Sequence, residues 1–239
     1  MANSTGPKII SDRIILIVDP LNVKSVTTES RNFNSLSPNK SDLIATNGLT
    51  WSSDQINNHG FNFGLTSSNI TTKSTLDFPS AFTVNAWVNL PTTGGQKTIL
   101  SDGGQTLSGY FWMLCTNDQL ELYFTEGFGN NVASSPTFFT GLINQWINLC
   151  VVVDYNSSSV NFYRNGTFVS SDTLFGFGNA KALAPASGKK KIIGNETDPP
   201  NLNDYYLTGR VGHLTVYSRL LTATEVLQNY RALRKRYNV

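Results

Sequence analysis

The chain has 239 residues, of which 39% are hydrophobic and only 14% are charged, and its 19 glycines suit many short strands joined by polar turns. The formal net charge of +2 is too small for a general nucleic-acid-binding protein, which carries a larger basic excess. No apolar run is long enough to cross a bilayer, and the apolar residues 14–18 are not expected to be a signal peptide, because polar residues precede them and no small-residue cleavage site follows. We therefore expect a chain made in the cytoplasm, without membrane insertion or nucleic-acid binding.

The two cysteines, Cys115 and Cys150, each lie inside an apolar run. A disulfide or a reactive thiol is one interpretation of them. For a chain made in the cytoplasm, we favour the interpretation that both are small, buried hydrophobic side chains. The cysteines and the two histidines, His59 and His213, are too far apart in the sequence for a zinc-binding spacing.

Residues 1–13 are predicted to form an N-terminal arm, and residues 14–239 a single domain without an internal linker. The apolar residues within 8–18 predict a first strand, which Asp19-Pro20 ends. Residues 21–60 are polar and predict long loops. Short strands are predicted at residues 42–45, 49–51, 61–63 and 69–72.

The middle of the chain alternates polar and apolar residues with a period of two, which is typical of half-buried strands. The dipeptide Asn165-Gly166 separates two of these runs and favours a tight hairpin turn, because both residues tolerate positive φ. Residues 127–135 lack this alternation and are interpreted as a flexible loop. The predicted strands are 82–88, 98–101, 110–115, 119–124, 146–153, 160–164 and 167–170.

The last third of the chain begins with a Gly- and Ala-rich loop at residues 174–188. A strand is predicted at 190–194, and a polar loop at 195–204. Residues 205–217 predict one long strand or two, broken near Gly209 or Gly212. About a dozen short strands with turn signals between them indicate an all-β sandwich or barrel.

One helix is predicted at about residues 222–236. Thr222 and Glu225 fit a capping box, in which their side chains satisfy exposed backbone N–H groups. An apolar stripe follows at Val226, Tyr230 and Leu233. A basic cluster near its end either meets an acidic partner or stabilises the helix C-terminus, and we favour the second interpretation. The cluster consists of Arg231, Arg234, Lys235 and Arg236.

Three stretches together resemble the laminin-G-like or concanavalin A-like jelly-roll superfamily. They are FTVNAWV at residues 82–88, the run from Trp146 to Val169, and GRVGHLTVYSRLL at 209–221 followed by Glu225 and Asn229-Tyr230. The resemblance implies an antiparallel jelly-roll β-sandwich with one C-terminal helix.

Both ends of the chain further resemble laminin-G-like structural proteins of tailed bacteriophages, notably cyanophages. The resemblance rests on GPKIISD at residues 6–12 with the apolar strand after it, and on NYRALRKRY at 229–237; Arg13 replaces the usual glycine. It implies a virion protein made in the host bacterial cytoplasm: a capsid decoration protein or a head, neck or tail accessory protein. Other virion proteins, such as the major capsid protein, would then be partners, and homo-oligomers are compatible with the many strand edges.

An alternative implied by the same superfamily is a lectin-like adsorption module that recognises a host surface polysaccharide. Tyr205 and Tyr206 are the candidate glycan-binding residues, although aromatic residues in strands more often belong to a core. The oxygen-rich residues Glu196, Asp198 and Asp204 are calcium candidates, and a solvated acidic loop is the interpretation we favour for them. No cofactor is assigned.

A glycoside hydrolase is the second alternative, because glycosidases also use this sandwich. Glycosidases need a pair of carboxylates that flank the sugar bond. The nearest match, Glu121 and Glu126, lacks the middle acid of the laminarinase-type signature, and its spacing puts the two side chains on opposite faces of a regular strand. His213 is predicted at the surface or rim and not as a catalytic base. We therefore assign no catalytic residue and predict that the chain is not an enzyme.

Overall fold

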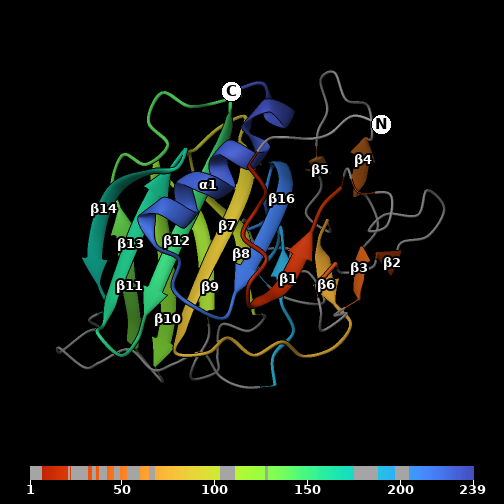
Figure 1. Ribbon diagram of the computed structural model, residues 1–239. Coiled ribbons are helices and arrows are strands. Elements are labelled where there is room, and N and C mark those ends of the chain that lie inside the picture. Colours follow the sequence, from red (N-terminus) through yellow and green to blue (C-terminus); the bar gives the residue numbers. More distant parts are fainter. Residues whose placement is uncertain are drawn as a thin grey trace.

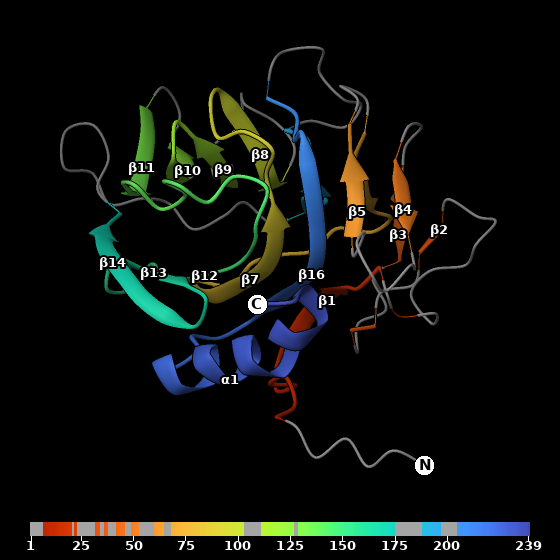
Figure 2. The ribbon, with the colours of Figure 1, turned by 90° about the horizontal axis from the view of Figure 1, so that it is seen from above.

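The computed structural model of the chain shows two antiparallel β-sheets packed face to face, with a helix against the outer face of one sheet (Figures 1 and 2). The predicted all-β sandwich with one C-terminal helix is confirmed. The residues that the structure describes are 7–20, 22, 32–33, 36–37, 42–45, 49–52, 60–64, 68–102, 111–126, 129–174, 188–196 and 205–239.

The first sheet, here called sheet A, has the strand order β14-β13-β12-β7-β16-β5-β4, with β1 also paired to β16. Its long central strands read as alternating or continuous apolar runs, which suits a sheet covered on both faces. The strands are β1 (Ile14–Val18), β4 (Thr50–Ser52), β5 (Gly60–Phe63), β7 (Ala81–Asn89), β12 (Trp146–Asp154), β13 (Ser159–Arg164), β14 (Thr167–Thr173) and β16 (Gly209–Tyr217).

The second sheet, sheet B, has the order β11-β10-β9-β8-β15-β6-β3-β2. Its consecutive strands β8 to β11 form a meander of hairpins, and the short strand β15 returns from late in the sequence to pair with both β6 and β8. The strands are β2 (Asn32–Phe33), β3 (Leu43–Ala45), β6 (Ile70–Thr72), β8 (Gln96–Ser101), β9 (Phe111–Thr116), β10 (Gln119–Glu126), β11 (Gly129–Ser135) and β15 (Ile192–Ile193).

The prediction of a flexible loop at residues 127–135 is wrong for most of these residues, because Gly129–Ser135 forms the edge strand β11. It pairs with β10 in unbroken register, from Glu126↔Gly129 to Leu120↔Ser135. Backbone hydrogen bonds to β10 therefore override a sequence with weak strand propensity. The first strand is also shorter than predicted, since β1 begins at Ile14, directly after Arg13 with a positive φ of 55°.

The core lies between the two sheets and is rich in phenylalanine. Phe78, Phe82 and Phe111 form a mutual cluster with ring centroids 4.8, 5.4 and 5.6 Å apart. Each ring is at least 96% buried, which stabilises the fold by about 1.5–3 kcal/mol per side chain relative to exposure. Tyr155 packs against the same cluster at 6.3 Å from Phe82.

The C-terminal helix α1 (Ala223–Leu233) covers the outer face of sheet A (Figure 2). Its predicted capping box is confirmed: Glu225 N donates to Thr222 Oγ1 over 3.3 Å, and Thr222 N donates to Glu225 Oε2 over 2.8 Å. A 3₁₀ turn, η1 (Arg234–Tyr237), follows and stacks Tyr237 on Trp87 with ring centroids 4.3 Å apart. Within the described part of the chain, no helix has the length and apolarity that a membrane span requires.

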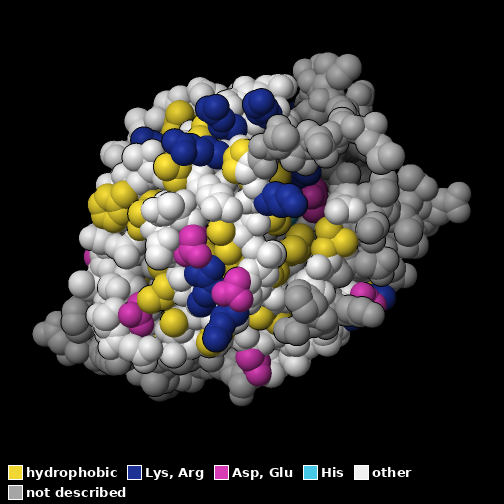
Figure 3. Space-filling view, in the orientation of Figure 1, with side chains coloured by type: hydrophobic (Ala, Val, Ile, Leu, Met, Phe, Trp, Pro, Cys, Tyr) yellow, Lys and Arg dark blue, Asp and Glu magenta, His cyan; other side chains and the backbone are white. Residues whose placement is uncertain are grey.

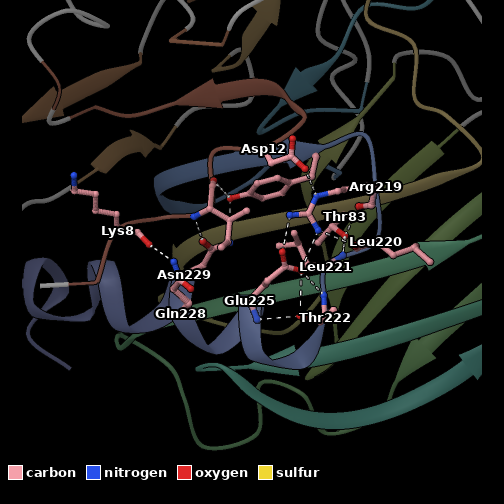
Figure 4. Close-up of polar contacts among 12 residues, drawn as sticks. Lys8, Asp12, Thr83, Arg219, Leu220, Leu221, Thr222, Glu225, Gln228 and Asn229 are labelled. Carbon is pink, nitrogen blue, oxygen red and sulfur yellow. Dashed lines mark hydrogen bonds and ion pairs between the residues drawn. The ribbon is translucent and has the colours of Figure 1, made fainter.

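Hydrogen bonds connect the segment before β1 to α1 (Figure 4). Ile10 N donates to Asn229 Oδ1 over 2.8 Å, and the Gln228 side chain donates to the Lys8 carbonyl, also over 2.8 Å. Arg219 pairs with Glu225 at the start of the helix and with Asp12 in the opening segment. The two ends of the described chain thus form one layer over sheet A.

Candidate functional site

An open groove of about 510 Å³ lies beside sheet B. One wall comes from the start of β8 and the glycine before it, and the other from the segment that leads into β16. Both tyrosines of this segment are partly exposed. The groove is lined by Gly95, Gln96, Lys97, Tyr205, Tyr206 and Thr208.

The segment of residues 205–208 is held in place by backbone hydrogen bonds, although it is not a strand. Thr98 N donates to the Tyr205 carbonyl over 3.3 Å, and the Thr98 hydroxyl donates to the same oxygen. Leu207 N donates to the Gly194 carbonyl over 2.9 Å, and the Leu207 side chain is fully buried. The anchored neighbours fix the backbone of Tyr206 on both sides.

A row of aromatic side chains supports the groove from the outer face of sheet B. The Trp112 ring lies between Tyr205, at 5.3 Å, and Tyr123, at 5.2 Å. Its Nε1 donates to the Thr98 hydroxyl over 2.8 Å, which fixes the ring. Burial, with the Glu121 carboxylate as a second cause, raises the pKa of Tyr123 to about 12, so its hydroxyl stays neutral.

This arrangement suits a ligand with both an apolar face and hydroxyl groups. Partly exposed tyrosine rings offer flat apolar surface, and the Gln96 amide and the Thr208 hydroxyl offer both donors and acceptors. The structure brings the two predicted candidates, Tyr205 and Tyr206, to this groove. Gln96, Lys97 and Thr208 could not be identified from the sequence, because they reach the groove only through the pairing of distant segments.

The three calcium candidates are only partly described. Glu196 is fully buried, its N–H donates to Asn195 Oδ1 over 2.7 Å, and its carbonyl accepts from the Ser101 hydroxyl over 3.0 Å. Asp198 and Asp204 lie outside the described residues. Among the residues that are described, no three His, Cys, Asp or Glu side chains gather in a metal-binding group. A calcium site at this loop stays a prediction.

The prediction that His213 lies at the surface or rim is wrong, because this residue is 97% buried. Strand β16 has an irregular register between Val211 and Leu214, and the 3₁₀ turn η1 packs over this point, where His213 N donates to the Tyr237 hydroxyl over 2.7 Å. The imidazole lies between Asp19, at 3.4 Å, and the Thr215 hydroxyl, at 2.6 Å.

The order Asp19–His213–Thr215 imitates a catalytic triad in its contacts. Thr215 is fully buried, so no substrate carbonyl reaches its hydroxyl. Asp19 also accepts two hydrogen bonds from the Arg236 guanidinium, at 2.8 and 3.0 Å. Although burial alone would raise it, the pKa of Asp19 is held well below its usual range by His213 and Arg236. The network joins the end of β1 to β16 and η1.

The two glutamates considered for glycoside hydrolysis lie on one strand. In β10, Glu121 is opposite Ser134, and Glu126 is opposite Gly129 at the end of the ladder. Burial raises the pKa of the Glu121 carboxyl. The side chain of Glu126 lies outside the described part of the structure, so the prediction about their faces is not tested.

The remaining sequence candidates are structural or solvent-exposed. Cys115 and Cys150 are buried and free, as predicted, and burial raises the pKa of the Cys115 thiol to about 12. Arg236 is an ion-pair partner of Asp19. The other members of the basic cluster, Arg231, Arg234 and Lys235, are exposed, where Lys and Arg side chains gather over the C-terminal end of α1 (Figure 3).

Solved structures with this fold include several binding domains. The binding domain of botulinum neurotoxin serotype D has a TM-score of 0.68 and 14% identity, over 92% of this chain and 52% of that one. Domain 4 of AbnA, a GH43 extracellular arabinanase from Geobacillus stearothermophilus solved in complex with arabinotriose, has a TM-score of 0.67 and 16% identity. The alignment with AbnA covers 94% of this chain and 99% of that domain.

The likeness to these structures is a likeness of fold, because the identities are low. The chain spans about half the length of the toxin binding domain, whereas it spans nearly the whole of the arabinanase domain. No curated protein is similar to the chain in sequence. The family described as the concanavalin A-like lectin/glucanases superfamily, Laminin_G_3, matches residues 45–227. The chain therefore belongs to the concanavalin A-like lectin/glucanases superfamily.

Proposed function

We propose that the chain is a carbohydrate-binding module that holds a sugar in the groove between β8 and residues 205–208. The observation that carries this proposal is the pair of partly exposed tyrosines, Tyr205 and Tyr206, fixed beside Gln96 and Thr208. The arabinanase domain with the same fold, solved with arabinotriose, supports a sugar as the ligand. The role we propose is binding without catalysis.

The groove is suited to bind a sugar at low entropic cost. The tyrosine rings would stack against the C–H face of a sugar ring, while Gln96 and Thr208 would exchange hydrogen bonds with its hydroxyls. Because hydrogen bonds to Thr98 and Gly194 already fix the backbone of this segment, binding does not have to order it.

Titration calorimetry with arabinotriose, together with an array of immobilised polysaccharides, tests the proposal. We expect Tyr206→Ala to weaken the binding of any retained glycan at least tenfold, which corresponds to about 1.4 kcal/mol. Phe168→Ala is the matched control, because Phe168 is an aromatic residue of β14 in sheet A with 52% exposure. Retention of no glycan, or equal binding by Tyr206→Ala and Phe168→Ala, would refute the proposal.

We also propose that the chain serves in the virion of a tailed bacteriophage, as a decoration or accessory protein next to the major capsid protein. The support is the sequence of the two ends, residues 6–19 and 229–237, and these ends contact each other through Ile10 and Asn229. A glycan-binding groove would then adsorb the particle to a host surface polysaccharide. Antibody labelling of purified particles in electron micrographs tests this placement, and particles that carry no label contradict it.

A further inference from the structure

A lysine and an aspartate face each other inside sheet B, at the point where β8 ends and β15 begins. The register pairs Ser101 with Ile192, so Asp102 and Lys191, which directly follow β8 and directly precede β15, come close together where this pairing ends. Their side chains are 1% and 0% exposed, and Lys191 Nζ lies 3.6 Å from Asp102 Oδ2. That separation is longer than a hydrogen bond between charged partners.

The surroundings of this pair are aromatic. Lys191 Nζ lies 4.4 Å from the centroid of the Phe78 ring, which packs on Phe82 and Phe111. Neither Lys191 Nζ nor Asp102 Oδ2 has a hydrogen-bond partner among the residues that the structure describes, and the same holds for the hydroxyl of the neighbouring Tyr155. Two unshielded charges are costly in such a place.

The environment destabilises the charged forms of both groups relative to water. Burial raises the pKa of Asp102 to about 6 and lowers the pKa of Lys191, and each partner only partly offsets the effect on the other. Transfer of one proton from the ammonium to Oδ2 gives an amine and a carboxylic acid. An amine is a nucleophile, and a carboxylic acid, unlike a carboxylate, is open to attack at its carbon.

We propose that Lys191 and Asp102 condense into an intramolecular isopeptide bond. The Nζ lone pair attacks Asp102 Cγ and forms the N–C bond. Oδ1 carries the negative charge of the tetrahedral intermediate, and it already accepts the Phe111 N–H at 2.8 Å, which is the donor that an oxyanion requires. The Cγ–Oδ2 bond then breaks, and Oδ2 leaves as water with the transferred proton and one further proton from Nζ.

The reaction needs no oxidant, enzyme or cofactor, because an amine and an acid give an amide and water. The fold accelerates the reaction because it holds the two groups in contact and away from solvent. The reaction is then intramolecular and needs no bimolecular encounter. The product would join β8 to β15 covalently and replace two buried charges by one amide.

Mass spectrometry of the folded full-length chain tests the proposal. We expect the intact mass to be lower than that of the sequence by one water molecule. A protease digest should give a branched peptide that contains both Asp102 and Lys191, without cleavage after Lys191. Lys191→Met and Asp102→Ala should each restore the full mass.

The wild-type chain alone decides the matter, so the outcome does not depend on whether the variants fold. Separate linear peptides that contain Asp102 and Lys191, together with the full sequence mass, would overturn the proposal and leave a buried ion pair. A time course adds a second criterion. Chain that has never folded, recovered from inclusion bodies in guanidinium chloride, should have the full mass and lose water only after refolding; a loss of water while the chain stays in denaturant would contradict the role of the fold.

Discussion

Gly194 offers a sharp test of the packing between the two sheets, because it follows β15 in sheet B and contacts β5 in sheet A. Its φ is +87°, and a methyl group at its Cα would lie 2.2 Å from two carbons of the Phe63 ring. Phe63 is fully buried, so its ring has no solvent to move into. Gly194→Ala must therefore displace either the ring or a strand.

The expected cost of Gly194→Ala has two parts. A non-glycine residue with left-handed backbone costs about 1–2 kcal/mol, and overpacking a well-filled core costs about 1–3 kcal/mol. The free energy of unfolding should therefore fall by about 2–5 kcal/mol. In thermal unfolding, each kcal/mol lowers Tm by about 2–4 °C in a chain of this size.

Gly188→Ala separates the two parts. Gly188 also has a positive φ, +75°, but no atom of the residues that the structure describes lies within 4 Å of a methyl group there. Gly188→Ala should therefore lower the free energy of unfolding only by the cost of the left-handed backbone, about 1–2 kcal/mol. Urea denaturation of both variants, with equal m-values, measures the difference. If Gly188→Ala and Gly194→Ala lower the free energy of unfolding equally, the contact with Phe63 does not contribute to the cost and the reasoning is wrong.

Three further predictions concern the C-terminal layer. Tyr237→Phe removes the hydroxyl that accepts the buried His213 N–H, so urea denaturation should show a loss of about 1–3 kcal/mol. Thr222→Ala removes the N-cap of α1 and should cost about 0.5–2 kcal/mol in the same assay. Arg219 holds the pKa of Glu225 at about 2, below its ordinary 4.5; the stability it gives is complete above pH 4.5 and is lost as the pH falls toward 2. Thermal unfolding between these pH values should therefore be less acid-sensitive in Glu225→Gln, and equal sensitivity would contradict the assignment.

The long strands and the helix could be predicted because their signals are local. Alternating apolar residues at 82–88 and 146–153 predicted β7 and β12 to within one residue, and Thr222 with Glu225 marked the helix start. Periodicity and capping depend on neighbours in the sequence, which a single sequence displays.

What could not be predicted depends on pairing between distant segments. Strand β11 exists because β10 supplies its hydrogen bonds, and His213 is buried because η1 returns to cover β16. The groove likewise needs Gln96 of β8 and Tyr206, which are far apart in the sequence, to lie side by side. Tyr205 and Tyr206 could be chosen as candidates from their residue type alone, but their position in a groove could not be predicted.

The place of β1 determines when the molecule can be completed. Among the described strands, the first one in the chain pairs with β16, the last one, which also separates β7 from β5 in the centre of sheet A. During synthesis, β1 must therefore wait for almost the whole chain before its partner leaves the ribosome, and Trp87 waits longer still for Tyr237 to cover it. Such long-range pairing makes folding slow and late. Until residues 209–237 have left the ribosome, the nascent chain carries an open sheet whose apolar outer face, with Trp87, is uncovered.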